Sequence, residues 1–325
     1  MNFKKILAAA TLTFLLAGCG GLSEIEAKNL AVKFINENLL SGGMTAEITN
    51  IAEESGLWKL DVKLSDGREV KSLLSKDGKI FVPEAIYIDE VEKAAAEQKA
   101  AETKTKTEAL AAIPKTAKPV VELFVMSYCP FGTQAEKAII PALEKLGDSV
   151  DFRLKFVDYA LHGEKEIKEN LLQFALSEKY PEKLIPYLQE FLKAGNSEAA
   201  LKAIGLTADD LKGTIDAADA KFEITKNFTD QTLWLKGQDG QPTYPHFNPD
   251  KEENAKYGVR GSPTLVVNGK VIDSVDRSPA GMLKAICSGF ETAAANCSAE
   301  LSTETASSGF GLDAANETGS NGQCS

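Results

Sequence analysis

The chain is poor in the residues that usually bind metal ions. It contains two histidines, His162 and His246, and five cysteines among 325 residues. Zinc sites are built from clustered histidine, cysteine and carboxylate ligands, and neither histidine lies in such a cluster. We therefore expect neither a metal ion nor another cofactor.

The chain also lacks an excess of positive charge. Its 36 lysines and arginines are outnumbered by 47 aspartates and glutamates, giving a net charge of −11 and a pI near 4.9. An acidic surface disfavours nucleic acid and offers no basic patch to anionic lipid. We therefore expect no nucleic-acid partner.

Long apolar runs are scarce. Lys4 and Lys5 precede the apolar stretch Ile6–Ala17, which is shorter than the ~20 residues of a membrane-spanning helix. The stretch ends in Leu16-Ala17-Gly18-Cys19, which resembles the lipobox of bacterial lipoproteins. This resemblance implies a signal peptide over residues 1–18 and a lipid on Cys19. The alternative is an ordinary signal peptide or membrane anchor with a chance cysteine.

A lipid on Cys19 would tether the mature protein to a membrane of the cell envelope, outside the cytoplasm. Disulfides persist in such oxidising compartments. Four cysteines then remain for other roles, namely Cys129, Cys287, Cys297 and Cys324.

The length favours two folded domains. Residues 19–89 predict a small α+β domain, since apolar residues recur at helical spacing from Ile25 to Leu39 and then alternate from Trp58 to Leu64. Such a domain has a thin core, so it is a candidate for pairing with a second copy. The segment Leu74–Phe81 is similar to the end of the dimerisation domain of DsbC-type disulfide isomerases. Residues 90–118, rich in Ala, Glu, Lys and Thr, predict a solvated helix that fades into a flexible linker.

From Val120 onward the pattern alternates between strands and helices, which predicts an α/β domain. The expected order is a strand, a helix and a strand, a helical block at about 160–248, then two strands and a helix. The block is expected to break at Tyr180-Pro181, Gly195-Asn196 and Gly205-Leu206-Thr207 and to end in a polar loop over Asn227–Asn248. The expected elements are Val120–Met126, Thr133–Leu146, Asp151–Val157, Thr264–Val267, Lys270–Asp273 and Pro279–Phe290.

Three motifs in this part resemble DsbA-like thiol–disulfide oxidoreductases. Phe124–Pro130 resembles the entry to their active site, Gly258–Thr264 their cis-proline loop, and Val266–Lys270 the hairpin that follows. The helical block is similar to that of the lysosomal thiol reductases. The resemblance implies a thioredoxin-like α/β fold with a helical insertion over residues 119–298. Residues 299–325 are expected to form a disordered tail.

The candidate catalytic residue is Cys129, which lies between a predicted strand and the N-terminus of a predicted helix. Unpaired backbone N–H groups and the helix dipole stabilise a thiolate at such a junction. The segment Cys129-Pro130-Phe131-Gly132 resembles a Cys-x-x-Cys motif in which the second cysteine is replaced by glycine. We therefore expect a reactive, partly exposed thiol. Two alternatives stay open: a small buried apolar residue, or a vestige of a former active site.

The candidate substrate-binding residues surround this thiol. They are Tyr128, Pro130, Phe131, Ser262 and Pro263. The resemblance implies a cis peptide bond before Pro263, whereas an ordinary trans proline would simply begin a buried strand. His162 or His246 could stabilise a thiolate, although both are also compatible with ordinary loop positions.

The other cysteines have separate expectations. Cys287 and Cys297 predict a structural disulfide, because they close a short loop in an oxidising compartment; a second redox pair is the rival interpretation. Cys324 is a candidate resolving thiol for Cys129, and the alternative is an incidental exposed cysteine.

These observations predict a membrane-tethered thiol–disulfide oxidoreductase or isomerase that acts through one cysteine. Its expected partners are cysteine-containing exported proteins and a redox partner or small thiol. The alternatives are a non-catalytic binding or chaperone module of the cell envelope and a structural lipoprotein.

Overall fold

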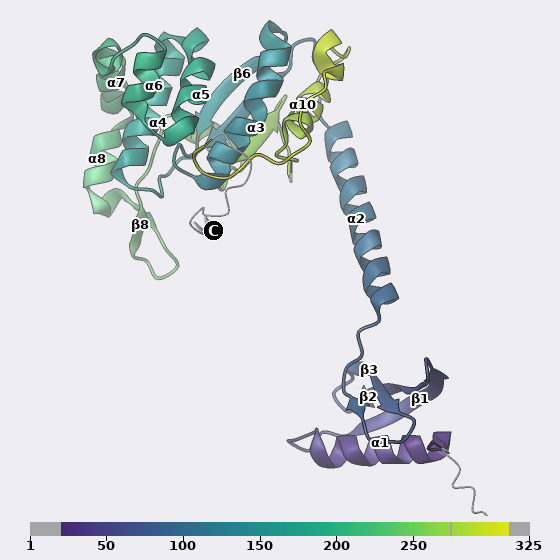
Figure 1. Cartoon of the computed structure of the whole chain (residues 1–325). Helices are drawn as coiled ribbons and strands as arrows, with labels where there is room; N and C mark the ends of the chain where they lie inside the picture. The colour runs from purple at the N-terminus through teal and green to yellow at the C-terminus, as the bar shows by residue number, and fades with distance from the viewer. Residues whose placement is uncertain (1–20, 274, 312–325) are drawn as a thin grey trace, which may run out of the picture. The chain divides into compact units, whose positions relative to one another are not determined.

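The computed structural model describes residues 21–273 and 275–311. Cys19 and Cys324 therefore lie outside the described residues. The chain divides into two compact units between Lys99 and Ala100, and each unit is described by itself (Figure 1). Within the described ranges, no helix is both long and apolar enough to cross a membrane.

The first unit is the predicted α+β domain. Helix α1 (Glu24–Asn38) packs Ala27, Ala31 and Ile35 against an antiparallel sheet of order β1-β2-β3-β4. The strands are β1 (Ala46–Glu54), β2 (Leu57–Leu64), β3 (Glu69–Ser75) and β4 (Phe81–Val82). The sequence pattern missed β1, because few of its side chains are buried and its apolar alternation is correspondingly weak.

Helix α2 (Ile88–Ala111) replaces most of the predicted linker. None of its residues is buried, so tertiary packing does not explain its formation. Its Ala, Glu and Lys residues have high helix propensity, and Lys93–Glu97 and Lys104–Glu108 form ion pairs four residues apart. The predicted solvated helix is therefore present, and it continues further than the sequence analysis expected.

The second unit contains a four-stranded sheet of order β10-β9-β5-β6. Strands β5 and β6 are parallel, β9 is antiparallel to β5, and β10 is antiparallel to β9. The strands are β5 (Val120–Val125), β6 (Asp151–Phe156), β9 (Thr264–Val267) and β10 (Lys270–Val271). A parallel strand–helix–strand unit followed by an antiparallel hairpin in this order is thioredoxin topology, as the sequence predicted.

Alternate residues of the central strand face two different cores, as the pleat of a strand requires. Leu123 and Val125 join the larger core, to which α3 (Pro130–Leu146) and α10 (Pro279–Cys287) contribute. Phe124 lies in the smaller cluster with Cys129 and touches Tyr257 of α9 (Lys251–Tyr257). The sheet is thus covered on both faces.

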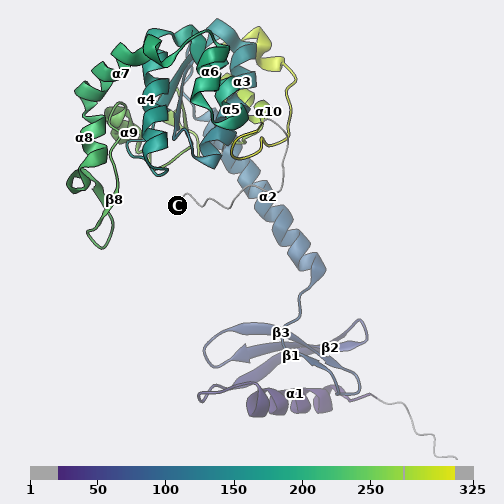
Figure 2. The same cartoon turned by 60° about the vertical axis from the view of Figure 1, so that its left-hand side comes forward.

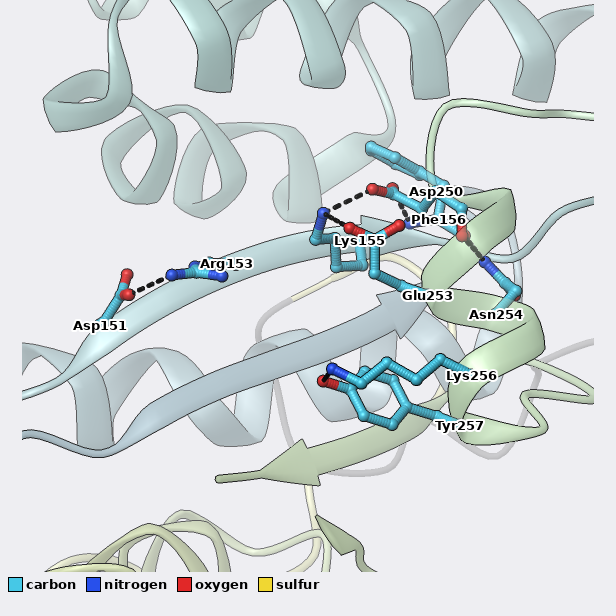
Figure 3. A network of polar contacts seen from close by, with 9 residues as sticks. All are labelled: Asp151, Arg153, Lys155, Phe156, Asp250, Glu253, Asn254, Lys256 and Tyr257. Carbon is cyan, nitrogen blue, oxygen red and sulfur yellow. Dashed lines mark hydrogen bonds and ion pairs between the residues drawn. The ribbon is translucent and has the colours of Figure 1, made fainter. Parts of the chain in front are cut away.

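A polar network fastens α9 to β6 (Figure 3). Lys155 Nζ lies 2.7 Å from Asp250 Oδ1, and Phe156 N donates to Asp250 Oδ2 at 2.8 Å. Asn254 Nδ2 donates to Phe156 O at 2.8 Å. Burial raises the pKa of the Asp250 carboxyl, and the neighbouring Lys155 ammonium opposes that rise. This network holds the segment that leads into the loop before Pro263.

The helical insertion lies between β6 and α9 and shares the larger core (Figure 2). Its chain breaks fall at Tyr180-Pro181 and Gly195-Asn196, as predicted. The expected polar loop after residue 227 instead contains the end of a helix and a small hairpin. The elements are α4 (Glu164–Lys179), α5 (Leu184–Ala194), α6 (Ser197–Ala203), α7 (Ala208–Phe222), α8 (Ile224–Thr229), β7 (Leu235–Lys236) and β8 (Pro242–Tyr244).

Candidate active site

The structure places Cys129 at the junction of β5 and α3 that the sequence indicated. Cys129 is the N-cap residue of α3 and has an extended backbone. Its N–H donates to Met126 O, and its carbonyl accepts from Thr133 N, which closes the first turn of the helix. Pro130 follows at the first helical position, where its missing N–H costs no hydrogen bond. The thiol therefore lies at the positive end of a helix dipole.

Cys129 is more buried than the sequence analysis expected. Its residue exposure is 0 %, and it packs with Phe124, Met126 and Val266 in the smaller apolar cluster. Its Sγ lies 3.5 Å from the carbonyl oxygen of Ser262, within reach of a thiol hydrogen bond. The expectation of a partly exposed thiol is thus wrong for this conformation.

The loop opposite the thiol contains the predicted cis peptide bond between Ser262 and Pro263. Side-chain hydrogen bonds help to hold this loop. Tyr159 Oη donates to Arg260 O at 2.8 Å, and Thr264 Oγ1 donates to Gly261 O at 2.9 Å. The cis-proline loop and the cysteine turn therefore face each other, as the resemblance implied.

Gly132 and Ser262 form a matched pair beside the thiol. Ser262 Oγ accepts a hydrogen bond from Met126 N at 2.9 Å. A Cβ atom at residue 132 would lie 2.6 Å from this oxygen and 3.0 Å from Met126 O. Real Cβ atoms do not approach other atoms so closely. The Ser262 hydroxyl thus fills part of the space in which the side chain of a second cysteine would begin.

The two aromatic neighbours of Cys129 and Pro130 differ in environment. Phe131 is 39 % exposed, and the guanidinium carbon of Arg277 lies 5.4 Å from its ring centre. Tyr128 is partly buried, donates from its hydroxyl to Gly195 O at 3.1 Å, and packs its ring edge-on against Phe191. Phe131 is therefore the more available contact for a substrate.

The chain after residue 299 packs against this region, contrary to the expected disordered tail. We call residues 301–311 the C-terminal strap. Gly309 N donates to Pro130 O at 3.1 Å, and Phe310 packs against Tyr128 at 5.5 Å between ring centres. The strap therefore touches both neighbours of the thiol.

Buried polar groups lie behind the site. Ser127 N donates to Asn170 Oδ1 at 3.0 Å, which ties the strand end to α4. Glu169 accepts hydrogen bonds from Gln173, Tyr187 and Ser197. Burial raises the pKa of the Glu169 carboxyl, and these hydrogen bonds oppose the rise.

Glu136 of α3 is completely surrounded by protein. Both of its carboxyl oxygens are buried without a hydrogen-bond partner. Burial, followed by the nearby Glu169 carboxyl, raises its pKa to about 8. Glu136 is therefore a neutral acid at neutral pH, inside the helix that begins at the candidate active site.

The two histidines have defined surroundings. His162 Nδ1 lies 2.5 Å from Glu166 Oε2, and Glu166 also accepts from Leu161 N at 2.8 Å. His246 pairs with Tyr159 in an isolated bridge between two backbone segments. Among residues 21–273 and 275–311, no group of three or more histidine, cysteine or carboxylate side chains could hold a metal ion.

Cys287 and Cys297 form a disulfide with a Cα–Cα distance of 5.8 Å. The pairing links the last residue of α10 to the short 3-10 turn Ala295–Ser298. It lies at the start of the segment that continues into the C-terminal strap. The predicted disulfide is thus present.

Sequence reasoning missed three features of this site. The Ser262 hydroxyl beside Gly132 depends on contacts across 130 positions of chain, so no local pattern could reveal it. Phe310 was overlooked inside a Ser/Gly-rich segment. Glu136 did carry a signal, because it falls on the apolar face of α3 with Ala135 and Ile139, which are both buried.

No family model matches the chain, and no curated protein matches it. Similar solved structures exist. BdbD from Bacillus subtilis in its oxidised form has 19 % identity over 54 % of this chain and 91 % of its own, with a TM-score of 0.35. Reduced DsbA from Mycobacterium tuberculosis has 12 % identity over 57 % of this chain and 91 % of its own, with a TM-score of 0.38.

DsbA from Pseudomonas aeruginosa has 20 % identity over 53 % of this chain and 83 % of its own, with a TM-score of 0.33. Because these sequence identities and TM-scores are low, the description of the fold rests on the strand order and the cis-proline loop of this structure.

Proposed function

We propose that this protein is a thiol–disulfide oxidoreductase or isomerase that acts through Cys129 alone. The observation that carries the proposal is that three features lie together at one place. Cys129 begins α3, the cis-proline loop faces its sulfur, and Gly132 leaves the helix without a second thiol. A thiolate at a helix N-terminus is the species that attacks disulfides.

The reaction takes place by two exchanges. The Cys129 thiolate attacks one sulfur of a substrate disulfide, forms a mixed disulfide and releases the other substrate sulfur as a thiolate. A second thiolate then attacks the substrate sulfur of the mixed disulfide and regenerates the Cys129 thiolate. The enzyme is unchanged overall, so the identity of the second thiol decides whether the substrate disulfide is moved or reduced.

The glycine at residue 132 favours isomerisation and thiol-assisted reduction over oxidation. A neighbouring cysteine would resolve the mixed disulfide rapidly, and Gly132 has no sulfur with which to do so. The proposed substrates are exported proteins that contain cysteine, and the proposed releasing agent is a small thiol or redox partner. The Cys287–Cys297 disulfide supports an oxidising location, and a lipid on Cys19 would supply the membrane tether.

The substrate surface is proposed to consist of Tyr128, Pro130 and Phe131 on one side and Ser262 and Pro263 on the other. Phe131 offers an exposed ring, and Pro263 has no N–H group that could obstruct an incoming substrate disulfide. An extended chain that approaches Cys129 would meet this loop.

The test is the release of glutathione from a peptide that carries it as a mixed disulfide, with reduced glutathione as the second substrate. We expect turnover by the wild-type chain and its loss in Cys129→Ala. Cys129→Ser serves as a closer steric match. Ser288→Ala, at the partly buried C-cap of α10, is the control and should retain turnover. Equal rates in wild type and Cys129→Ala would refute the proposal.

A non-catalytic binding or chaperone module is the second candidate, and the full burial of Cys129 favours it. The two candidates differ in thiol access. A catalytic Cys129 must open to reagents while the protein stays folded, so native protein should be alkylated at this residue. A binding module would be alkylated there only after denaturation.

Pairing with a second copy is proposed for the first unit. Phe34 of α1 is 40 % exposed and Ile80 beside β4 is 65 % exposed, which leaves apolar surface around a shallow hollow at Leu30 and Phe81. Light scattering on the full chain should give the mass of a dimer, and Phe34→Asp should shift it to that of a monomer. An unchanged monomer mass in wild type would contradict the pairing.

A further inference from the structure

The C-terminal strap lies on the surface that is proposed for the substrate. Gly309 N donates to Pro130 O at 3.1 Å, and Phe310 packs edge-on against Tyr128 with 5.5 Å between ring centres. Pro130 and Tyr128 are the two chain neighbours of Cys129, and both belong to the proposed substrate surface. The strap therefore occupies part of the surface that a substrate chain would need.

One large side chain anchors the strap. The ring centre of Phe310 lies 5.5 Å from that of Tyr128 and 5.3 Å from that of Phe191. Gly195 leaves room for this ring, because a Cβ atom there would lie 2.8 Å from it. Edge-on aromatic contacts of this kind are favourable. We call Tyr128, Phe191 and Gly195 the aromatic site, since together they form a fitted place for an aromatic side chain.

Several hydrogen bonds of the strap do not depend on its sequence. Gln134 Nε2 donates to the carbonyl oxygen of Ala306 at 2.7 Å, and Lys137 Nζ donates to that of Gly311 at 2.9 Å. A side-chain partner is also present, because Lys137 Nζ donates to Ser307 Oγ at 2.8 Å. Every peptide chain has backbone carbonyl groups, so another extended chain on this surface would accept the same hydrogen bonds from α3.

The strap fills the space beneath it only in part. A cavity of about 490 Å³ lies between the strap, α3 and α5. Packed protein interiors contain few voids larger than a water molecule, so the strap is not packed like the core. Segments with few buried apolar contacts open at a lower free-energy cost than the core around them. The strap is thus the part of this domain that leaves most easily while the rest stays folded. The cavity is lined by Ile140, Pro141, Leu192, Pro279, Thr305 and Ala306, among others.

We propose that the C-terminal strap is an internal competitor of the substrate, and that an extended segment of a substrate protein with an aromatic residue displaces it. The inference rests on the proposed function and names the kind of segment that the site receives. The aromatic side chain of the substrate takes the place of Phe310 in the aromatic site. Its backbone takes the place of Gly309 at Pro130 O, which brings the substrate chain beside Cys129.

Competition determines the size of the effect. The apparent dissociation constant of a ligand is its intrinsic constant divided by the fraction of molecules whose site is free. Truncation of an aromatic anchor in an interface weakens binding by about 30-fold or more. Phe310→Ala should therefore raise the fraction of molecules with a free site, and lower the apparent dissociation constant, by about 30-fold.

The test measures the binding of a fluorescein-labelled peptide with the sequence of residues 301–311 to the full chain by fluorescence polarisation. Every protein variant carries Cys129→Ala, so that no disulfide chemistry contributes. We expect weak binding to the chain that retains Phe310 and about 30-fold tighter binding to Phe310→Ala. A peptide that itself carries Phe310→Ala should bind neither chain. Phe228→Ala is the matched control, because Phe228 is also partly buried and stacks on Trp234, and it should leave the affinity unchanged.

Gly309→Pro is a second variant that releases the strap without truncating its anchor. Gly309 has a φ of 74°, which proline cannot adopt, and proline lacks the N–H that donates to Pro130 O. The peptide should therefore bind Gly309→Pro about fivefold more tightly than the chain with an unaltered strap. Circular dichroism of each variant checks that the domain remains folded.

The two proposals fail in different ways. If neither Phe310→Ala nor Gly309→Pro binds the peptide more tightly, or if Phe228→Ala has as large an effect as Phe310→Ala, the competitor role of the strap is overturned. Those results do not depend on the chemistry of Cys129. If the peptide binds as expected but chains with and without Cys129 show equal turnover, the proposed thiol chemistry fails and the peptide-binding surface stands.

Discussion

Gly132→Ala tests the packing that separates this site from a two-cysteine site. The added Cβ would lie 2.6 Å from Ser262 Oγ and 3.0 Å from Met126 O. The second of these atoms belongs to the backbone, so the loop and the strand end must move apart. Insertion of a methyl group into a tightly packed place costs about 1–3 kcal/mol. The Cβ atom of a cysteine at this position would make the same close contacts, wherever its sulfur lies.

The matched control is Gly213→Ala in α7. Gly213 is also helical, and nothing lies within 4 Å of its added Cβ. Alanine in place of glycine in a helix gains roughly 0.5–1 kcal/mol, so Gly213→Ala should stabilise the protein. The unfolding free energies of the two variants, measured by urea denaturation without reductant, should differ by about 1–3 kcal/mol. Equal stabilisation by both would refute the argument.

A double-mutant cycle identifies the contact that is responsible. Ser262→Ala alone removes the oxygen that accepts from Met126 N, which costs about 1–3 kcal/mol because a buried N–H loses its partner. In the Gly132→Ala background this oxygen is also the clashing atom, so its removal should cost about 1 kcal/mol less. Additive effects within about 0.3 kcal/mol would show that Ser262 does not fill the space beside Gly132.

Three further predictions concern stability. Glu136 has a pKa of about 8 in the folded protein, compared with an ordinary value of 4.5. Between pH 4.5 and pH 8 the native state therefore binds more protons than the unfolded state, so the free energy of unfolding falls as the pH rises. Glu136→Gln should remove this loss and raise stability at pH 9 by roughly 3–5 kcal/mol relative to wild type; parallel pH profiles of the two would contradict it. Cys287→Ser with Cys297→Ser opens a loop with a sequence separation of 10 and should cost about 3 kcal/mol in thermal denaturation; an unchanged Tm would count against a structural bridge. Asp250→Asn removes the more buried of the two carboxylates that pair with the half-buried Lys155 and leaves Glu253 at 3.3 Å, so it should cost about 1–3 kcal/mol by urea denaturation, whereas Asp239→Asn on an exposed turn should cost little.

Local sequence patterns predicted most of the second unit. The strand Val120–Val125 is apolar at every position except Glu122, as expected for a strand with both faces covered. The breaks in the insertion fall at Gly195 and at Pro181, where a left-handed residue or a missing N–H ends a helix. These features depend on neighbours in the chain, and sequence reveals them.

Other features depend on contacts between distant segments. The hydroxyl of Ser262 beside Gly132, and the strap that brings Phe310 to Tyr128, join residues more than 100 positions apart. Composition suggested disorder after residue 299, because Ser and Gly outnumber apolar residues there. Phe310, which fits beside Gly195, and hydrogen bonds such as that from Gly309 N to Pro130 O hold the strap, and contacts between such distant residues have no local signature.

The most direct test of the central claim is the covalent intermediate itself. The full chain is mixed with an unfolded protein that contains a disulfide, quenched in acid, alkylated and separated without reductant. The proposed mechanism predicts a mixed disulfide that peptide mapping assigns to Cys129 and that is lost in Cys129→Ala. Absence of any adduct on Cys129 while the thiol remains reduced, or the same adducts in Cys129→Ala, would contradict it.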